Sequence, residues 1–253
     1  MSHSEREAGD KVRVLITGSS NGLGLAAART LLAQGHEVVT YVRSQGRMPA
    51  VGELVGHGTI ATICHLSDLG QIRDLAQQVN AIGWMDAVIH NAGVISGAIQ
   101  LVNVVASYLL TALVQQPSRL IHLSSSMHSD GIARLDRMDW SCQREAGSYS
   151  DSRLFVTTLA AAVARRWPDV YSNAVNPGWV PTRMGGGLNA PEDLRLGHLT
   201  QEWLATSKDP RTITSGGYWH HQKRQQRHPA ANDMRFQDQL LAKLARTTGT
   251  NLA

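Results

Sequence analysis

The chain has 253 residues, of which 42% are hydrophobic and 17% are charged, and its formal net charge is +4. This length suits one α/β domain with a sizeable core, and the composition is that of an ordinary soluble globular protein. The small, dispersed charge argues against a nucleic-acid partner, and no apolar run approaches the roughly 20 residues of a membrane span. Two cysteines are too few for a disulfide framework, so we expect a reducing, cytoplasmic location.

Short apolar runs alternate along the chain with segments of helical periodicity. The apolar runs predict strands over residues 12–16, 37–42, 59–64, 86–90, 119–124 and 171–176, with a last edge strand at Tyr218 and Trp219. The periodic segments predict helices over residues 22–34, 67–81, 101–114, 149–167 and 236–246. Gly35 closes the first of these helices, and Ser67 caps the second.

Strands that alternate with helices indicate βαβ units, and these predict a doubly wound parallel sheet, a Rossmann fold, with helices on both faces. Its ligand cleft lies at the carboxyl ends of the strands. No repeat or linker interrupts the pattern, so we expect residues 11–253 to form one domain after a disordered lead-in of residues 1–10. The stretch 177–214 is rich in Gly and Pro and is predicted to be a flap over the cleft.

A glycine-rich loop at residues 17–24 follows the first strand and opens the first helix, which is the context of a dinucleotide site. Its glycines would allow a sharp turn, a close approach to a pyrophosphate and tight packing of helix on sheet, with the phosphates at the helix N-terminus. A tight turn that holds no ligand is the alternative. The predicted cofactor-binding residues of the loop are Gly18, Ser20, Asn21, Gly22, Leu23 and Gly24.

The end of the second strand bears on the choice of nicotinamide cofactor. An acidic residue there would bind the ribose hydroxyls of NAD. This chain has Arg43 instead, and arginine suits a 2′-phosphate through charge-assisted hydrogen bonds. A solvated surface arginine is the alternative. The sequence favours NADP(H) over NAD(H).

Taken in order, these motifs resemble those of the short-chain dehydrogenase/reductase family. The glycine loop matches its TGxxxGxG pattern, residues 90–93 its NAG motif, and residues 176–178 its PG motif. The stretch 149–184 is most similar to the retinol-dehydrogenase-like branch, which includes bacterial ketoreductases. The resemblance implies hydride transfer between a nicotinamide and a small carbonyl or alcohol substrate. It adds these cofactor-binding residues: Asp68, Leu69, Asn91, Ala92, Gly93, Pro177, Gly178 and Thr182.

The resemblance also assigns the catalytic asparagine, serine, tyrosine and lysine of the family. Asn103 matches the asparagine, and Tyr149 matches the tyrosine. Ser125, just after the fifth strand, matches the serine, with Ser124 as the alternative. Arg153 falls on the position of the lysine, so this sequence departs from the family pattern at one catalytic position.

The implied reduction needs a proton for the alkoxide that forms. Tyrosine can donate it, a neighbouring cation favours the resulting phenolate, and a serine hydroxyl polarises the substrate oxygen. One helical turn separates Tyr149 from Arg153, so we expect both to face the cofactor. Arginine keeps the positive charge but does not readily deprotonate, which would block a proton relay.

An NADP-dependent oxidoreductase is the leading hypothesis, and a non-catalytic NADP-binding protein that senses the cofactor or binds partners is the alternative.

Three further expectations concern the surroundings of this site. Only nine residues separate Gly93 from Asn103, fewer than is usual in the family, which would reshape the substrate mouth or pull Asn103 away from Arg153 unless the trimmed loop is harmless. The histidines of residues 220–228 are not predicted to bind metal, because adjacent histidines in an extended segment point to opposite faces. The resemblance allows a homodimer or homotetramer, paired through the helices over 101–114 and 149–167.

Overall fold

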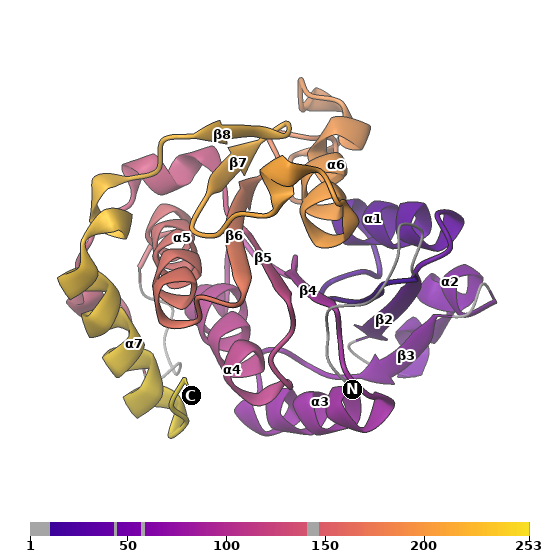
Figure 1. The fold of residues 1–253 in the computed structure, drawn as a ribbon, viewed down its shortest axis with the longest axis horizontal. Coiled ribbons are helices and arrows are strands. Elements are labelled where there is room, and N and C mark those ends of the chain that lie inside the picture. Colours follow the sequence, from indigo (N-terminus) through magenta and orange to yellow (C-terminus); the bar gives the residue numbers. More distant parts are fainter. Residues whose placement is uncertain (1–10, 43–44, 57–58, 141–146, 253) are drawn as a thin grey trace.

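The computed structural model describes residues 11–42, 45–56, 59–140 and 147–252. An eight-stranded sheet in the order β3-β2-β1-β4-β5-β6-β7-β8 runs through the molecule (Figure 1). All neighbouring strands are parallel except β7 and β8. The strands are β1 (Arg13–Ile16), β2 (Glu37–Val42), β3 (Ile60–Ile63), β4 (Ala87–His90), β5 (Arg119–Leu123), β6 (Tyr171–Asn176), β7 (Tyr218–His220) and β8 (Lys223–Gln225). The predicted doubly wound parallel sheet is confirmed.

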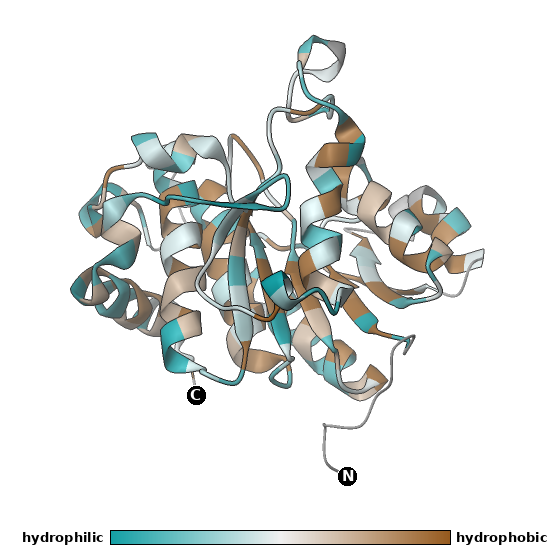
Figure 2. Cartoon of the chain, turned by 45° about the horizontal axis from the view of Figure 1, so that its top comes forward, coloured by the Kyte–Doolittle hydropathy of each residue, from teal (hydrophilic) through white to brown (hydrophobic). Residues whose placement is uncertain are grey.

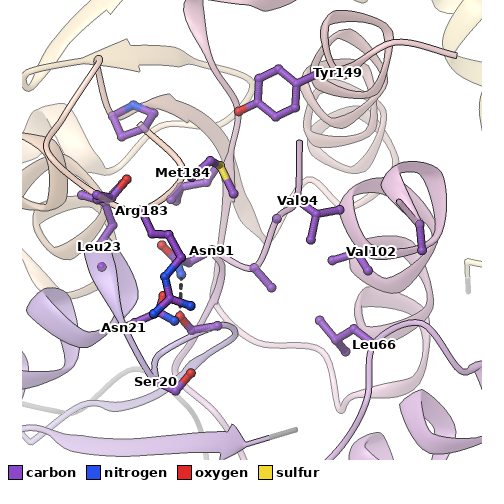
Figure 3. A pocket seen from close by; sticks show the side chains of 18 of the residues that line it. Ser20, Asn21, Leu23, Leu66, Asn91, Val94, Val102, Tyr149, Arg183 and Met184 are labelled. Atoms are coloured by element: carbon purple, nitrogen blue, oxygen red, sulfur yellow. Dashed lines mark hydrogen bonds between the residues drawn. The ribbon is translucent and has the colours of Figure 1, made fainter. Parts of the chain in front are cut away.

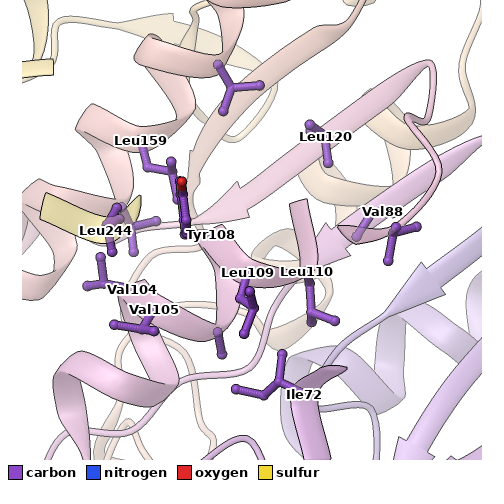
Figure 4. Packing of buried hydrophobic residues seen from close by; sticks show 14 of the residues in the cluster. Ile72, Val88, Val104, Val105, Tyr108, Leu109, Leu110, Leu120, Leu159 and Leu244 are labelled. Atoms are coloured by element: carbon purple, nitrogen blue, oxygen red, sulfur yellow. The ribbon is translucent and has the colours of Figure 1, made fainter. Parts of the chain in front are cut away.

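Helices cover both faces of the sheet (Figure 1). They are α1 (Gly22–Ala33), α2 (Gly52–Gly56), α3 (Leu69–Ile82), α4 (Ala106–Leu113), α5 (Tyr149–Arg166), α6 (Leu194–Thr206) and α7 (Met234–Thr248). Helices α3, α4, α5 and α7 share one hydrophobic core, in which Tyr108 and Leu109 are fully buried (Figure 4). Helices α1, α2 and α6 share the core of the opposite face. Figure 2 shows hydrophobic residues concentrated on the strands and on the helix sides that face them.

The part of the chain after β6 differs from the prediction in two places. Tyr218 and Trp219 do not form an edge strand, because β8 pairs with β7 and is the outer strand. The predicted flap over 177–214 contains α6, whose buried residues pack against α1 and the sheet. The part of that stretch that borders the cleft is therefore confined to the residues before α6. No helix among the described residues is long and apolar enough to span a membrane.

Helix boundaries follow local capping chemistry. Helix α1 ends at Ala33, and Gly35 then adopts a positive φ of 86°, as a helix-closing glycine should. Helix α3 is capped by Asp68 and not by the predicted Ser67, because the Asp68 carboxylate accepts from the backbone N–H groups of Gly70 and Gln71.

Candidate cofactor and catalytic site

A cleft of about 370 Å³ lies at the carboxyl ends of the parallel strands, where the topology predicts a ligand site. Its volume falls in the range of small-molecule pockets. Figure 3 shows Ser20 and Asn21 at one end of the hollow and Tyr149 at the other. The predicted residues that line it are Gly18, Ser20, Asn21, Gly22, Leu23, Asn91, Ala92, Gly93, Tyr149, Arg153, Pro177 and Thr182. The cleft thus unites the predicted nucleotide loop with the predicted catalytic helix.

The glycine loop is held in place by the segment that follows β4. The side-chain amide of Asn91 donates to the carbonyl oxygens of Thr17 (2.9 Å) and Gly18 (3.2 Å). The backbone N–H of Ala92 donates to Oγ1 of Thr17 at 2.9 Å. A Cβ atom at Gly24 would overlap the Asn91 amide and the Gly18 carbonyl, so this close packing requires glycine. Gly24 lies behind the cleft and is not part of its lining.

The N-terminus of α1 opens into the cleft, and no side chain caps it among the described residues. Asn21 occupies the N-cap position, but its side chain makes no capping hydrogen bond, and the first turn contains no acidic residue. The positive end of the helix dipole and the first N–H groups of α1 therefore lie at Gly22 and Leu23, which line the cleft. This arrangement fits a phosphate group.

The charge of the lining also suits an anion. None of the described lining residues is acidic, whereas Arg153 and Arg183 carry positive charge. Arg183 was not predicted; its side chain extends from the loop after β6 toward Asn21 (Figure 3). Arg43, on which the preference for NADP(H) rests, lies outside the described residues.

Tyr149 and Arg153 are brought together by the first turn of α5. Ser148 and Asp151 form a capping box that fixes the start of this helix. As expected, both Tyr149 and Arg153 line the cleft. The guanidinium carbon of Arg153 lies 4.7 Å from the centre of the Tyr149 ring, which is the distance of a cation–π contact.

Arg153 is a buried cation, with 4% of its surface exposed. Its Nη1 donates to the carbonyl oxygen of Leu123 at 2.7 Å, while its buried Nε has no hydrogen-bond partner among the described residues. A Cβ atom at Gly93 would overlap Nη2 of Arg153, so the guanidinium occupies space that only a glycine leaves free. An arginine therefore fits this position without displacing the loop after β4.

Asn103 lies directly behind this guanidinium. Its Oδ1 accepts from the backbone N–H of Val94 at 2.8 Å, and its Nδ2 donates to the Val94 carbonyl and to Oγ of Ser152, each at 3.0 Å. Arg153 and Asn103 both approach the space beside Gly93. Of the outcomes considered for the short segment after Gly93, displacement of Asn103 from Arg153 is therefore not observed.

Asn103 lies in a π-helical turn over Gln100–Val105. A π turn holds more residues than an α turn and is frequent at functional sites. Asn103 is almost fully buried within it and does not line the cleft. Its hydrogen bonds tie the loop after β4 to α5.

The two candidate serines have different surroundings. Ser124 lines the cleft, but its hydroxyl is bonded to Oγ1 of Thr157 at 2.7 Å and to the carbonyl of Arg153 at 3.3 Å. Ser125 is not among the lining residues, and its Oγ accepts from the backbone N–H of Met127 at 3.2 Å. The hydroxyl of Ser125 is thus still able to donate, and the assignment of Ser125 stays a prediction.

Besides Gly24, three predicted cofactor residues of the described chain lie outside the lining: Asp68, Leu69 and Gly178. The Asp68 carboxylate already serves as the cap of α3. Other residues, at the end of a strand, in a segment that follows a strand or in the short segment before Asn103, also line the cleft and were missed. They are Tyr41, His65, Leu66, Ser67, Val94, Ala98, Val102, Leu123, Arg183 and Met184. Their position at strand ends was the signal that could have found most of them.

Comparisons with known proteins agree with this geometry. A family model described as short chain dehydrogenase matches residues 12–116. An uncharacterized oxidoreductase of Emericella nidulans is 33% identical over 246 residues, covering 91% of this chain and 94% of that protein. Retinol dehydrogenase 13 of Homo sapiens is 27% identical over 198 residues, covering 68% of this chain and 60% of that protein. A blue fluorescent protein from a metagenomic library, solved in complex with NADPH, has a TM-score of 0.67 and 20% identity, with 83% of this chain and 95% of that chain covered.

Proposed function

Because the chain belongs to the short-chain dehydrogenase/reductase family, we propose that it is an NADP(H)-dependent oxidoreductase acting on a carbonyl or alcohol substrate. One observation carries the proposal. A single cleft joins the uncapped N-terminus of α1 to the Tyr149–Arg153 pair, so a phosphate site and a proton donor face the same space.

The residues present fit a dinucleotide. The backbone of residues 20–23 would hold the phosphates at the start of α1, with Arg183 as a further cation. Residues 91–93 and Thr182 would hold the nicotinamide half, beside the guanidinium of Arg153. Arg43 would bind the 2′-phosphate. The NADPH complex of a structural neighbour supports this choice of cofactor.

The chain's own catalytic task is the transfer of a proton. When bound, the nicotinamide supplies or accepts the hydride. Tyr149 would donate its phenolic proton to the substrate oxygen, and the charge of Arg153 against its ring would stabilise the phenolate that remains. Ser125 would donate a hydrogen bond to the same oxygen. Asn103 would act by position, since its hydrogen bonds hold the loop after β4 against α5.

The substrate end of the cleft is apolar. Val94, Val102 and Met184 project into the hollow near Tyr149 (Figure 3), and Ala98 also lines it. Apolar walls with one polar group at the reacting centre suit a hydrophobic ketone, aldehyde or alcohol. The retinol dehydrogenase relative is consistent with such a substrate.

A non-catalytic NADP-binding protein is the second candidate. The observation that favours it is the firm anchoring of Arg153 to the Leu123 carbonyl, since a guanidinium held there cannot relay protons as an amine can. The two functions differ in whether Tyr149 affects a reaction rate.

Turnover with NADPH across a panel of apolar ketones and aldehydes distinguishes them. We expect the wild type to oxidise NADPH with at least one member of the panel. Tyr149→Phe should lower kcat by about 100-fold or more, because it removes the proton donor but keeps the ring. No turnover by the wild type, or equal turnover by Tyr149→Phe, would contradict the proposed catalytic role.

A further inference from the structure

Outside the cleft, three metal-ligating side chains converge beside the loop after β6. They are Glu192, just before α6, and His220 and His221 at the end of β7. Nε2 of His221 lies 3.2 Å from Oε2 of Glu192, and Nε2 of His220 lies 3.9 Å from the same oxygen. One ligand atom from each residue lies within 4.8 Å of the others. None of the three lines the cofactor cleft.

The turn between β7 and β8 brings the two histidines together. His221 and Gln222 have positive φ angles of 47° and 59°, so the chain leaves the extended conformation directly after His220. The two imidazole rings stack with their centres 3.8 Å apart. The expectation that adjacent histidines point to opposite faces was wrong, because it assumed an extended backbone at residue 221.

The hydrogen bonds around the cluster leave the ligand atoms free. Nδ1 of His220 donates to the Asn176 carbonyl at 3.2 Å, which leaves the lone pair on Nε2. Oε1 of Glu192 accepts from the backbone N–H of Trp179 at 2.6 Å, which leaves Oε2. Oε2 of Glu192 and Nε2 of His221 are both buried and have no hydrogen-bond partner among the described residues.

The loop after β6 leaves room at Gly178 for the carboxylate of Glu192. Gly178 has a φ of 83°, and a Cβ atom there would overlap the Glu192 carboxylate. The glycine of the PG motif thus allows Glu192 to lie against residues 178–179. A carbonyl that orients an imidazole and an N–H that orients a carboxylate are the outer partners usual for metal ligands.

We propose that Glu192, His220 and His221 form a site for a divalent transition metal ion, best suited to zinc. Two imidazole nitrogens and one carboxylate oxygen are a known zinc donor set, with water as the fourth ligand. Zinc bonds of about 2.0–2.1 Å require ligand atoms a little over 3 Å apart. The 3.2 Å between Nε2 of His221 and Oε2 of Glu192 matches this separation, and Nε2 of His220 lies 3.9 Å from the same oxygen. A bound ion would join the segment before α6 to the β7–β8 turn and so fix the loop that borders the cofactor cleft.

Isothermal titration of the EDTA-treated full chain with Zn²⁺, without nucleotide, tests the site. We expect one ion per chain, bound at least about 10-fold more weakly by Glu192→Gln and by His221→Gln. His36→Gln is the matched control, because His36 lies between α1 and β2 and should not affect binding. Equal affinity in all four proteins, or no binding by the wild type, would overturn the site in favour of a Glu192–His221 ion pair without metal.

Cobalt spectroscopy keeps the test informative if a variant fails to fold. Co²⁺ added to the metal-free wild type should give the intense visible absorption of a four- or five-coordinate ion, and Zn²⁺ should abolish it. The weak spectrum of hydrated Co²⁺ alone would overturn the proposal. Because neither experiment uses the cofactor or a substrate, their outcome is independent of the proposed oxidoreductase activity.

Discussion

At the scale of single residues, the proposed function depends on Arg153, which the sequence resemblance places at the position of the family's lysine. Arg153 is buried, contacts the Tyr149 ring and is anchored by the Leu123 carbonyl. These contacts place a positive charge next to Tyr149, the proposed proton donor. What arginine cannot supply is a readily released proton. We therefore propose that Arg153 acts through its positive charge and not as a proton relay.

Removal of that charge tests its role. We expect Arg153→Met to lower kcat by about 100-fold, because the phenolate of Tyr149 loses its stabilising cation. Arg153→Lys should retain most of the turnover, since it keeps the charge and matches the family pattern. Steady-state kinetics with a substrate found in the panel measure both variants. Comparable activity in Arg153→Met and the wild type would show that the charge is not needed.

Gly93 provides a second test at this scale. A Cβ atom there would meet Nη2 of Arg153, so Gly93→Ala should displace the guanidinium, lower turnover and cost about 1–3 kcal/mol of stability. Gly52→Ala is the matched control, because no atom lies within 4 Å of the Cβ position at Gly52. Urea unfolding and steady-state kinetics report the two effects. A Gly93→Ala protein as stable and as active as Gly52→Ala would mean that the guanidinium is not confined as described.

At the scale of helices and strands, the parallel sheet was predictable because its central strands are buried on both faces and appear as continuous apolar runs. β8 was missed because Lys223–Gln225 is exposed and contains no apolar residue. α6 was missed because its buried face includes polar residues such as Gln201 and Glu202, which weaken the hydrophobic pattern. In the candidate site, glycine motifs revealed the backbone positions, whereas contacts such as that of Arg153 with Gly93 depend on tertiary packing.

Asp68 is the N-cap of α3 in the structure, whereas the family resemblance predicts that it contacts the cofactor. Because Asp68 is the N-cap of α3, Asp68→Ala should lower the midpoint temperature of unfolding and leave NADPH affinity unchanged. Thermal unfolding and a cofactor titration on the same sample measure the two quantities. A marked loss of NADPH affinity would instead support the adenine contact predicted from the family resemblance.

Two histidines on neighbouring strands predict acid sensitivity. His90 of β4 and His122 of β5 stack with ring centres 4.7 Å apart in the interior. Burial lowers the pKa of His90 to about 3, and burial together with the neighbouring His90 lowers the pKa of His122 well below its ordinary value. Both pKa values are depressed in the folded state, so the unfolded chain binds more protons once the pH falls below about 6.5. Stability is therefore retained above that pH and lost below it.

His122→Asn removes one of these titrating groups. Relative to the wild type, the variant should gain about 1.4 kcal/mol in free energy of unfolding for each pH unit below about 6.5. Above pH 7 this pH-dependent difference should vanish, leaving a constant offset. Urea unfolding at several pH values provides the measurement. Parallel pH profiles for the two proteins would show that His122 does not contribute to acid sensitivity.

At the scale of the whole molecule, the C-terminal helix bears on assembly. The family resemblance allowed a homodimer or homotetramer through the helices over 101–114 and 149–167. In the structure, α7 packs along α5 within the same chain (Figure 1), and 13 residues of α5 are buried. The α5 surface needed for the expected pairing is therefore covered. We expect a monomer by size-exclusion chromatography with light scattering, and a dimer at low micromolar concentration would show that another surface pairs.

If the protein is an NADP(H)-dependent oxidoreductase, its cleft must bind a reduced dinucleotide from the start of α1 to Tyr149. A titration of the full chain with NADPH and with NADH, followed by nicotinamide fluorescence, tests it without knowledge of the substrate. We predict saturable binding of one NADPH per chain, with weaker binding of NADH, and a loss of this preference in Arg43→Ala. Absence of saturable binding of either nucleotide to the folded protein would contradict the proposal that the cleft binds a nicotinamide cofactor.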